Sequence, residues 1–525
     1  MRAACLQQIA RDVKDYRKAW EDILLLIDKA AENDIDLAVL PECAYPAYYL
    51  GYDMDKTSEA MGFMDKVISD ISDKARKYGI YVAVGVAVKK GNELYNAGML
   101  FDRKGILINS CGKSNLWHFD RKWFSCGTTF DVVETDIGKL GMMICADGRN
   151  PEISRILALK GAEIIIDMAN LTASGSDPSK LSNPQFEYML PARALENGVW
   201  LIMADKVGVE ADSVLYAGRS CIISPEGEIA ASASSDKEEI IFADIDLQID
   251  RKQLPERKPE AYKLLAQATE ELPVYKEITM PAVIQNTETQ ASVVQFNYDT
   301  EKVFVEKAVN FLKALEDQDC TLIMFPQLKR GMDLMSSANK VREAIKHKDT
   351  IVALTGYRKD SGNEFKSTII ASRDNVFGIY DKVHADEKGV MEGSCNNAVI
   401  KTPLCNIGVM HDQEGIIPEA ARCLMLGGAD IILWSDNRYT EKADIISRTR
   451  ASENKVYLAR TSRVDKKDTS MIAGPDGRIL ASTFRGIDQS TGTMLVTALS
   501  KSKTVVPGTN VILDRKPQIY GLLAR

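Results

Sequence analysis

The residue whose setting points most directly to chemistry is Cys145. It follows the apolar run 141–144 and opens a polar turn that leads, from Pro151, into a predicted helix. A thiol in such a turn lies where backbone N–H groups and a helix N-terminus converge, so we expect its thiolate and a neighbouring oxyanion to be stabilised. A cysteine taken alone is more often a buried packing residue. The assignment of Cys145 as a nucleophile therefore depends on the residues that accompany it.

Two further side chains supply the other groups that amide hydrolysis needs. Glu42 follows the apolar segment 36–40 at the carboxyl end of a predicted strand, and Lys113 lies in the otherwise uncharged stretch 111–117. A carboxylate can take a thiol proton and deliver it to a leaving amine, and an ammonium group can neutralise the oxyanion of a tetrahedral intermediate. Singly, Glu42 and Lys113 have the alternative interpretation of solvated surface charges. With Cys145 they suffice for acyl transfer from an amide to water.

The composition excludes several other classes of protein. Across 525 residues, 66 basic and 74 acidic side chains give a net charge of -8, and charges of both signs are interspersed. No basic face for nucleic acid is evident, so we expect no nucleic-acid partner. The segment 1–9 is too polar for a signal peptide, and no segment has the ~20 apolar residues of a membrane span. These features predict a cytoplasmic protein without a membrane partner.

Cysteine and histidine spacing argues against a metal site and against disulfides. The ten cysteines have no paired spacing, and no Cys-x-x-Cys or clustered Cys/His pattern occurs. The four histidines have no ligand spacing and offer little to a Ser-His or Cys-His pair. We therefore expect reduced thiols, no bound metal and a carboxylate as the activating base.

The chain contains an internal duplication, which sets its domain organisation. Segments of the first half recur in the same order in the second half, and chance similarity does not preserve such an order. The matched pairs are 37–42 with 322–327, 141–155 with 408–422, 193–197 with 450–454, and 254–266 with 513–524. We predict a first domain over about 1–270, a polar linker over 271–290 and a second domain over 291–525.

Each half mixes short strands with helices, which predicts a layered α/β fold. Apolar runs of strand length that are rich in β-branched residues occupy 80–88, 163–166 and 200–203. Helical patterns occupy 16–31, 151–160 and 185–197. Pro151 stands at a first-turn position where proline is tolerated, and Gly161 follows as a stop signal. The pattern therefore places Cys145 at a strand-to-helix turn.

Several motifs keep a fixed order along the first half of the chain. They are LPE at 40–42, GKSNLW at 112–117, DRKWFSCG at 120–127, CADGRNPEISR at 145–155 and ARALEN at 192–197. Together they resemble the nitrilase superfamily of carbon–nitrogen hydrolases. The resemblance covers essentially all of the first copy and, more weakly, the second. It implies two tandem α-β-β-α sandwich domains and no metal or organic cofactor.

The resemblance also implies roles for individual residues. The catalytic Glu, Lys and Cys of the superfamily correspond here to Glu42, Lys113 and Cys145. A second acid often follows the lysine in this family. This chain has Asp120 at that place, where glutamate is more usual. Asp120 is therefore the fourth predicted catalytic residue, with a shorter reach into the site.

The residues after the cysteine bear on the branch of the superfamily. True nitrilases usually have Trp-Glu there, whereas Ala146 and its successors resemble the amidase and N-carbamoyl amino acid amidohydrolase branches. That resemblance implies substrate contacts for Ala146 and Asn170. Carbamoylases carry two adjacent arginines that hold a substrate carboxylate, and here Arg149 stands alone. Arg149 either binds a carboxylate through its planar guanidinium or pairs with Glu152.

The second copy departs from the catalytic pattern. Gln327 and Asp412 stand opposite the predicted base and nucleophile, whereas Lys382 still matches the predicted lysine. A glutamine is no proton acceptor at neutral pH, and a carboxylate lacks the nucleophilicity of a thiolate toward amides. We expect an inactive second domain that acts as a built-in pseudo-subunit, so that the chain forms an internal pseudo-dimer. Further homo-oligomerisation stays open. An alternative use is that the altered pocket around Asp412 and Lys382 binds a regulator.

These residues predict a hydrolase of non-peptide carbon–nitrogen bonds. Cys145 would attack a linear amide or ureido carbon, Glu42 would shuttle the proton and Lys113 would stabilise the oxyanion. Ammonia or an amine would leave before water releases the acyl-enzyme, so the expected partner is a small-molecule amide or ureido substrate. Two alternatives stay open. One is a nitrilase that converts a nitrile to acid and ammonia, which the aromatic stretch 45–52 favours, and the other is a non-catalytic binding or scaffold protein.

Overall fold

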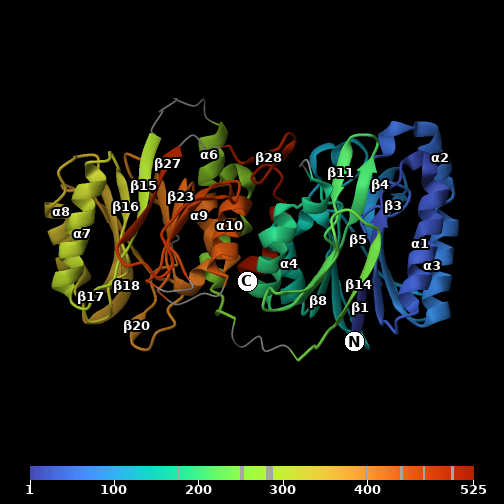
Figure 1. Ribbon diagram of the computed structural model, residues 1–525, viewed down its shortest axis with the longest axis horizontal. Helices are drawn as coiled ribbons and strands as arrows, with labels where there is room; N and C mark the ends of the chain where they lie inside the picture. The colour runs from blue at the N-terminus through green and yellow to red at the C-terminus, as the bar shows by residue number, and fades with distance from the viewer. Residues whose placement is uncertain are drawn as a thin grey trace. The chain divides into compact units, whose positions relative to one another are not determined.

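The chain divides into two compact units (Figure 1). The computed structural model describes residues 1–173, 177–248, 254–279, 288–395, 399–437, 442–464, 468–497 and 502–525, so that 280–287 of the predicted linker lies outside the described residues. Unit 1 comprises Met1–Leu254 with Val506–Thr509, and unit 2 comprises Pro255–Val505 with Asn510–Arg525. In each unit two β-sheets face each other and helices cover their outer faces. The predicted pair of α-β-β-α sandwiches is confirmed.

Unit 1 is built on two sheets. The first has the order β11-β10-β1-β2-β3-β4-β5, with β14 paired to β1, and its strands are β1 (Arg2–Ile9), β2 (Leu37–Val39), β3 (Tyr81–Lys90), β4 (Glu93–Phe101), β5 (Leu107–Gly112), β10 (Lys206–Glu210), β11 (Val214–Ala217) and β14 (Glu239–Asp244). The second has the order β13-β12-β9-β8-β7-β6, and its strands are β6 (Val132–Thr135), β7 (Gly138–Ile144), β8 (Ile164–Met168), β9 (Trp200–Ala204), β12 (Cys221–Ile223) and β13 (Ile229–Ser232). Because β1, β2 and β3 pair in parallel, as do β7, β8 and β9, the carboxyl ends of these strands gather at one edge of each sheet.

Helices cover the outer face of each sheet of unit 1 (Figure 1). Those on the first sheet are α1 (Tyr16–Ala31), α2 (Met54–Gly62) and α3 (Met64–Tyr78), and those on the second are α4 (Pro151–Leu159) and α5 (Leu190–Asn197). In α1 the buried side chains include Ala19, Ile23 and Ile27, a spacing of four that places them on one helix face. This face packs with residues of β1 to β4 in one apolar core.

The predicted elements of unit 1 agree with the observed ones to within two residues at each end, except over 185–197. There a π-helical turn, Gln185–Met189, precedes α5. Pro191 has no N–H to donate to a carbonyl group one turn earlier, so the hydrogen-bond register changes in front of it.

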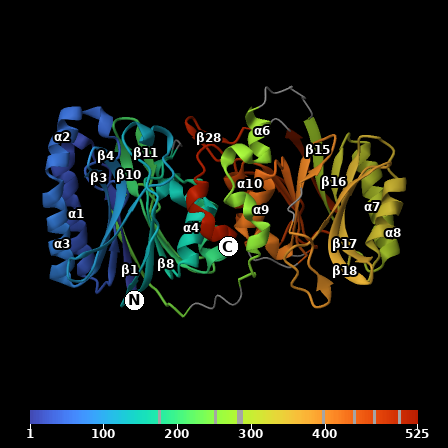
Figure 2. The same ribbon diagram turned by 180° about the vertical axis from the view of Figure 1, so that it is seen from behind.

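Unit 2 repeats the arrangement (Figure 2). Its first sheet has the order β19-β18-β17-β16-β15-β27, with β20 paired to β18, and its strands are β15 (Glu288–Gln295), β16 (Leu322–Met324), β17 (Ile351–Asp360), β18 (Asn363–Ala371), β19 (Val376–Asp381), β20 (Val390–Met391) and β27 (Ser490–Thr497). Its second sheet has the order β21-β22-β23-β24-β25-β26, and its strands are β21 (Ile400–Lys401), β22 (Asn406–His411), β23 (Ile431–Ser435), β24 (Tyr457–Thr461), β25 (Met471–Ala473) and β26 (Ile479–Ser482). The helices are α6 (Pro273–Thr279), α7 (Glu301–Glu316), α8 (Leu334–Glu343), α9 (Pro418–Leu426) and α10 (Ala443–Asn454), and α7 and α8 cover the first sheet.

Residues 255–270, which the repeat groups with the first copy, belong to unit 2 in the structure. Arg257 Nη2 donates a hydrogen bond to Leu523 O at 2.6 Å, and Arg515 Nη2 donates to Leu265 O at 2.6 Å. Each repeated tail thus supplies an arginine that satisfies a carbonyl group of the other tail. These hydrogen bonds explain why the first tail packs with the second copy.

Three further properties bear on function. No helix in the described ranges combines the length and the hydropathy needed to cross a membrane. All ten cysteines are free thiols. Within the part of the chain that the structure describes, no group of three or more His, Cys, Asp or Glu side chains is placed to hold a metal ion.

Candidate active site

The predicted catalytic residues of unit 1 lie just beyond the carboxyl ends of strands from both sheets. Glu42 follows β2, Lys113 directly follows β5, and Cys145 directly follows β7. β2 and β5 belong to one sheet, whereas β7 belongs to the other. The site is therefore assembled where the two facing sheets meet, from segments far apart in the sequence.

Lys113 joins the two predicted acids. Its Nζ lies 2.7 Å from Glu42 Oε1 and 2.7 Å from Asp120 Oδ2, and all three side chains are fully buried. Asp120 thus reaches the lysine although it is one methylene shorter than glutamate. Burial lowers the pKa of Lys113, but the two carboxylates outweigh burial and hold this pKa well above its usual value. Lys113 therefore stays an ammonium group.

Glu42 has one engaged carboxylate oxygen and one free one. Oε1 accepts hydrogen bonds from Lys113 Nζ and from Asn96 Nδ2, the latter at 2.5 Å. Oε2 has no hydrogen-bond partner among the described residues. Burial raises the pKa of Glu42, and the Lys113 ammonium offsets only part of this rise. A carboxylate with a free oxygen and a raised pKa is suited to accept a proton from a thiol.

Cys145 is held at the first residue of a tight turn. This 3-10 turn, Cys145–Arg149, lies between β7 and α4, and Cys145 has a φ of 51°. The N–H of Cys145 donates to Asp167 Oδ1 at 2.7 Å, and its C=O accepts from Gln185 Nε2 at 2.8 Å. A left-handed backbone is costly for a non-glycine residue and persists only where its surroundings hold it. The two hydrogen bonds supply that support.

The thiol of Cys145 rests in its protonated form. Its side chain is 7% exposed, and Sγ donates a weak hydrogen bond to Asn170 O at 3.8 Å. Burial raises the pKa of the thiol well above its usual value, and the charge of Glu42 adds to this rise. The expectation of a thiolate stabilised by a helix N-terminus is wrong for this resting state, because α4 begins only at Pro151, beyond the 3-10 turn. A nucleophilic role for this thiol would therefore require a base, and the Glu42 carboxylate is a candidate for it.

Arg149 contacts a tryptophan ring and has no ion-pair partner among the described residues. Its Cζ lies 4.8 Å from the centroid of the Trp117 ring, a cation–π contact. Within the described residues this guanidinium makes no hydrogen bond or ion pair, so the alternative in which Arg149 pairs with Glu152 is not adopted. Burial lowers the pKa of Arg149. A half-buried, unpaired guanidinium beside the catalytic turn is suited to bind an anionic group.

The other two predicted substrate contacts lie beside the catalytic residues. Asn170 Nδ2 donates to Glu42 O at 2.9 Å, and its Oδ1 is buried without a hydrogen-bond partner in the described part of the chain. Ala146 follows Cys145 in the turn and is 3% exposed. Asn170 therefore links the segment of the base to that of the nucleophile, whereas Ala146 contributes a small side chain and its backbone.

Sequence reasoning missed the residues that support this cluster. Asn96 bonds to Glu42, Asp167 bonds to the Cys145 N–H, and Gln185 bonds to the Cys145 carbonyl. The sequence could have indicated a supporting role for Asp167, because this residue places a charge within the apolar strand β8, where it is fully buried. No sequence feature indicated Asn96 or Gln185, since their hydrogen-bond partners lie 54 and 40 residues away in the chain.

Unit 2 has a corresponding cluster with different chemistry. Asp412 directly follows β22, as Cys145 follows β7, and has a φ of 44°. Its Oδ2 pairs with Lys382 Nζ at 3.0 Å and also with Lys366 Nζ. Burial by itself would raise the pKa of Asp412. The two ammonium groups outweigh burial and hold this pKa well below its usual range. A carboxylate paired in this way is not a nucleophile for amides.

A family model described as carbon-nitrogen hydrolase matches residues 2–250 and again residues 290–502. These two matches cover most of the chain and coincide with the two sandwiches. The chain belongs to the carbon–nitrogen hydrolase family and contains two tandem copies of its domain.

Individual relatives carry the names of nitrilases and amidases. A nitrilase of Pyrococcus abyssi is 34% identical over 250 residues, which are 46% of this chain and 88% of that protein. An omega-amidase of Danio rerio is 29% identical over 235 residues, which are 42% of this chain and 80% of that protein. Among solved structures, an amidase from Nesterenkonia sp. is 25% identical and covers 48% of this chain and 94% of its own, with a TM-score of 0.42. The relatives support hydrolase activity of the carbon–nitrogen type.

Proposed function

We propose that unit 1 hydrolyses the carbon–nitrogen bond of a small linear amide or ureido compound that carries a carboxylate. The observation that supports this most directly is the buried cluster in which Lys113 joins Glu42 and Asp120 beside Cys145. Membership of the carbon–nitrogen hydrolase family supports the same class of reaction.

The reaction begins with a proton transfer within the cluster. Glu42 Oε2 takes the thiol proton while Cys145 Sγ attacks the carbonyl carbon, so that a C–S bond forms and the carbonyl oxygen becomes an oxyanion. Lys113, held by its two carboxylates, neutralises this oxyanion. Collapse of the intermediate breaks the C–N bond, and Glu42 gives its proton to the departing ammonia or amine.

The second half of the reaction reuses the same groups. Glu42 deprotonates a water molecule, which attacks the thioester carbon, and Lys113 again neutralises the oxyanion. The C–S bond then breaks, Cys145 regains its proton from Glu42, and the acid leaves. Asp120 keeps the ammonium group in place throughout, because its Oδ2 holds Lys113 Nζ at 2.7 Å.

Arg149 supports a substrate with a carboxylate. Its guanidinium is unpaired and lies beside the turn that carries Cys145, so a bidentate hydrogen bond to a carboxylate would satisfy it. Both an amide of a dicarboxylic acid and an N-carbamoyl amino acid have such a group. A nitrile is the second candidate substrate, which the similarity to the Pyrococcus abyssi nitrilase favours.

The test is ammonia release from N-carbamoyl amino acids, amides with and without a carboxylate, and simple nitriles. We expect turnover of carboxylate-bearing amides or ureido acids, and complete loss of it in Cys145→Ala. The matched control is Cys126→Ala, which removes an exposed thiol of the same unit and should keep full activity. Turnover confined to nitriles would overturn the amide assignment, and turnover that survives Cys145→Ala would overturn the assigned nucleophile.

We further propose that unit 2 is a non-catalytic partner of unit 1. Asp412 replaces the nucleophile and is paired with two lysines, and Gln327 replaces the base. Ammonia release that survives Cys145→Ala but disappears when Asp412→Asn is added would instead assign hydrolytic activity to unit 2.

A further inference from the structure

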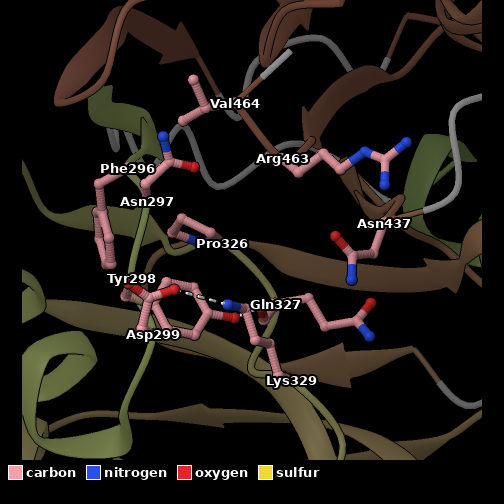
Figure 3. A pocket seen from close by; sticks show the side chains of 10 residues that line it. All are labelled: Phe296, Asn297, Tyr298, Asp299, Pro326, Gln327, Lys329, Asn437, Arg463 and Val464. Carbon is pink, nitrogen blue, oxygen red and sulfur yellow. Dashed lines mark hydrogen bonds and ion pairs between the residues drawn. The ribbon is translucent and has the colours of Figure 1, made fainter.

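Unit 2 contains an open cavity of about 480 Å³ beyond the carboxyl ends of strands from both of its sheets (Figure 3). The lining residues lie within five positions of the carboxyl ends of β15, β16, β23 and β24. Two of them, Gln327 and Asn437, stand at the positions that Glu42 and Asn170 occupy in unit 1. The cavity is therefore the unit 2 counterpart of the substrate site of unit 1.

The cavity has lost the means for covalent chemistry. Asp412 stands at the position of the nucleophile and is engaged by the ammonium groups of Lys366 and Lys382. A glutamine carboxamide at the position of the base accepts no proton near neutral pH. Whatever enters this cavity is therefore bound and released without hydrolysis.

Gln327 offers a buried acceptor to a ligand. The residue is 6% exposed and lines the cavity, and its Oε1 has no hydrogen-bond partner in the described ranges. An acceptor removed from water without a partner costs free energy, which a ligand N–H or O–H group would recover. The ligand therefore carries a donor at the end that meets Gln327.

Arg463 offers an unpaired cation at the same cavity. It is exposed, and its guanidinium makes no hydrogen bond or ion pair among the described residues. The other cation of the lining, Lys329, is already 3.4 Å from Asp299 Oδ1. Figure 3 shows the ends of the Gln327, Asn437 and Arg463 side chains following one another along one side of the cavity. A single small molecule can therefore meet a guanidinium, a carboxamide and the free acceptor.

We propose that this cavity is a binding site for a small carboxylic acid that carries an N–H donor at its other end. Arg463 binds the carboxylate through its planar fork, and Gln327 Oε1 accepts from the donor. The Asn437 carboxamide lies between them and can donate to or accept from either group. The proposal rests on the residues of unit 2 and holds whether or not unit 1 has the activity proposed above.

The probe is succinamate, which has a carboxylate at one end and a carboxamide at the other. It is titrated by calorimetry into the full-length Cys145→Ala, Arg149→Gln protein, in which unit 1 has lost both its nucleophile and its unpaired guanidinium. We expect one succinamate bound per chain. Adding Arg463→Gln should weaken this binding roughly tenfold or more, since a charge-assisted pair is lost. The matched control is Arg373→Gln, an exposed arginine of unit 2 outside the cavity, which should leave the affinity unchanged.

Two related probes and one variant test the donor and the acceptor separately. Propionamide lacks the carboxylate and succinate lacks the N–H donor, so each should bind more weakly than succinamate. Gln327→Leu, which removes the free acceptor, should bring succinamate down to the affinity of succinate. The proposal is overturned if succinamate shows no saturable binding to the full-length protein, or if Arg463→Gln leaves its affinity unchanged. Because unit 1 is disabled in this background, either result is independent of the ammonia-release test of the proposed function.

Discussion

At the scale of single residues, the site combines a neutral nucleophile with a charged cluster. The pKa of Cys145 and that of Glu42 are both raised by burial, while Lys113 remains an ammonium group between two carboxylates. Forming the thiolate beforehand would place another charge in a buried site at high cost. In the proposed mechanism, proton transfer to Glu42 during the attack avoids this cost, because negative charge moves from the carboxylate to the oxyanion beside Lys113.

Replacing Asn96 by leucine tests this assignment of the base. The Asn96 Nδ2 hydrogen bond at 2.5 Å stabilises the Glu42 carboxylate, so its loss should raise the pKa of Glu42 further. A general base must be deprotonated, and the acidic limb of kcat/KM against pH should therefore move to higher pH. Asn109→Leu, which lies on β5 and bonds to the Asp131 carbonyl, is the control and should leave the profile unchanged. An unshifted profile in Asn96→Leu would exclude Glu42 as the titrating base.

Replacing Arg149 by glutamine tests the carboxylate contact. We expect KM for carboxylate-bearing amides to rise roughly 10- to 100-fold, since a hydrogen bond to a charged group contributes about 1.5–3 kcal/mol. Amides without a carboxylate should keep their KM, because Arg149 has no role in their binding. The measurement is steady-state ammonia release on paired substrates of similar length. Equal losses on both kinds of substrate would instead assign Arg149 a structural role.

At the scale of elements, both units use a buried carboxylate to clamp the turn after a corresponding strand, β7 or β22, to a neighbouring loop. In unit 1 Asp147, in the turn after β7, accepts from the backbone N–H groups of Ser114 and Asn115 just beyond β5. In unit 2 Glu414, in the turn after β22, accepts from the backbone N–H of Val383 just beyond β19. The clamp survives in the copy whose chemistry has changed, which indicates that it maintains the fold of the turn.

The clamp of unit 2 predicts a stability that depends on pH. Burial by itself would raise the pKa of Glu414. Hydrogen bonding from His384 outweighs burial and lowers this pKa from 4.5 to about 2. The stabilisation that the Glu414 carboxylate gives to folded unit 2 is present above pH 4.5 and is lost as the pH falls toward 2. Burial lowers the pKa of His411 from 6.5 to about 4, so the unfolded chain takes up a proton between these values that the folded unit does not. Both groups make the free energy of unfolding of unit 2 decrease on acidification from pH 6.5.

Glu414→Gln measures the first of these contributions. At pH 7 the variant should lose roughly 2–4 kcal/mol of stability, and its pH dependence between 4.5 and 2 should flatten. Hydrogen exchange of peptides that cover β22 and α9 reports this loss for unit 2 alone. Glu343→Gln replaces an exposed carboxylate of the same unit and serves as the control. A pH slope equal to that of the unchanged protein would show that Glu414 is not the titrating group.

At the scale of the whole molecule, the two units exchange short segments of chain. Residues 255–270 belong to unit 2, and Val506–Thr509 belong to unit 1, where Thr509 Oγ1 accepts from His118 N at 2.9 Å. Neither unit is therefore a continuous stretch of sequence. The domain boundary near residue 270 stays a prediction from the repeat. Because residues 255–270 pack within unit 2, a cut after residue 270 would separate this tail from the segments it packs against.

A chain that ends after residue 270 tests the dependence of unit 1 on the rest of the protein. We expect it to lose solubility and most of its ammonia release, because it lacks 506–509 and leaves the tail 255–270 without its hydrogen-bond partners. Light scattering measures its association state beside the activity assay. A soluble, monomeric and fully active product would contradict the role of unit 2 as a built-in partner.

The sequence by itself was enough for the fold class and the duplication, and it supplied the candidate catalytic residues. Hydrophobic periodicity is a local property, so the strands around β8 and the helix α1 could be predicted within two residues. Glu42, Lys113 and Cys145 could be named because their types are those that amide hydrolysis needs and their motifs follow a family order. The family model and the two sandwiches agree with that prediction of the fold.

Only the tertiary structure decided the charge states and the partners. The thiol pKa depends on burial and on the charges of Glu42 and Lys113, which lie 71 residues apart in the chain. That Arg149 contacts the Trp117 ring and does not pair with Glu152 required the side-chain directions in three dimensions. The exchanged tails and the cavity beside Gln327 likewise arise from contacts between distant segments. Spacing along the chain specifies local conformation, whereas desolvation and Coulomb energy depend on distances in space.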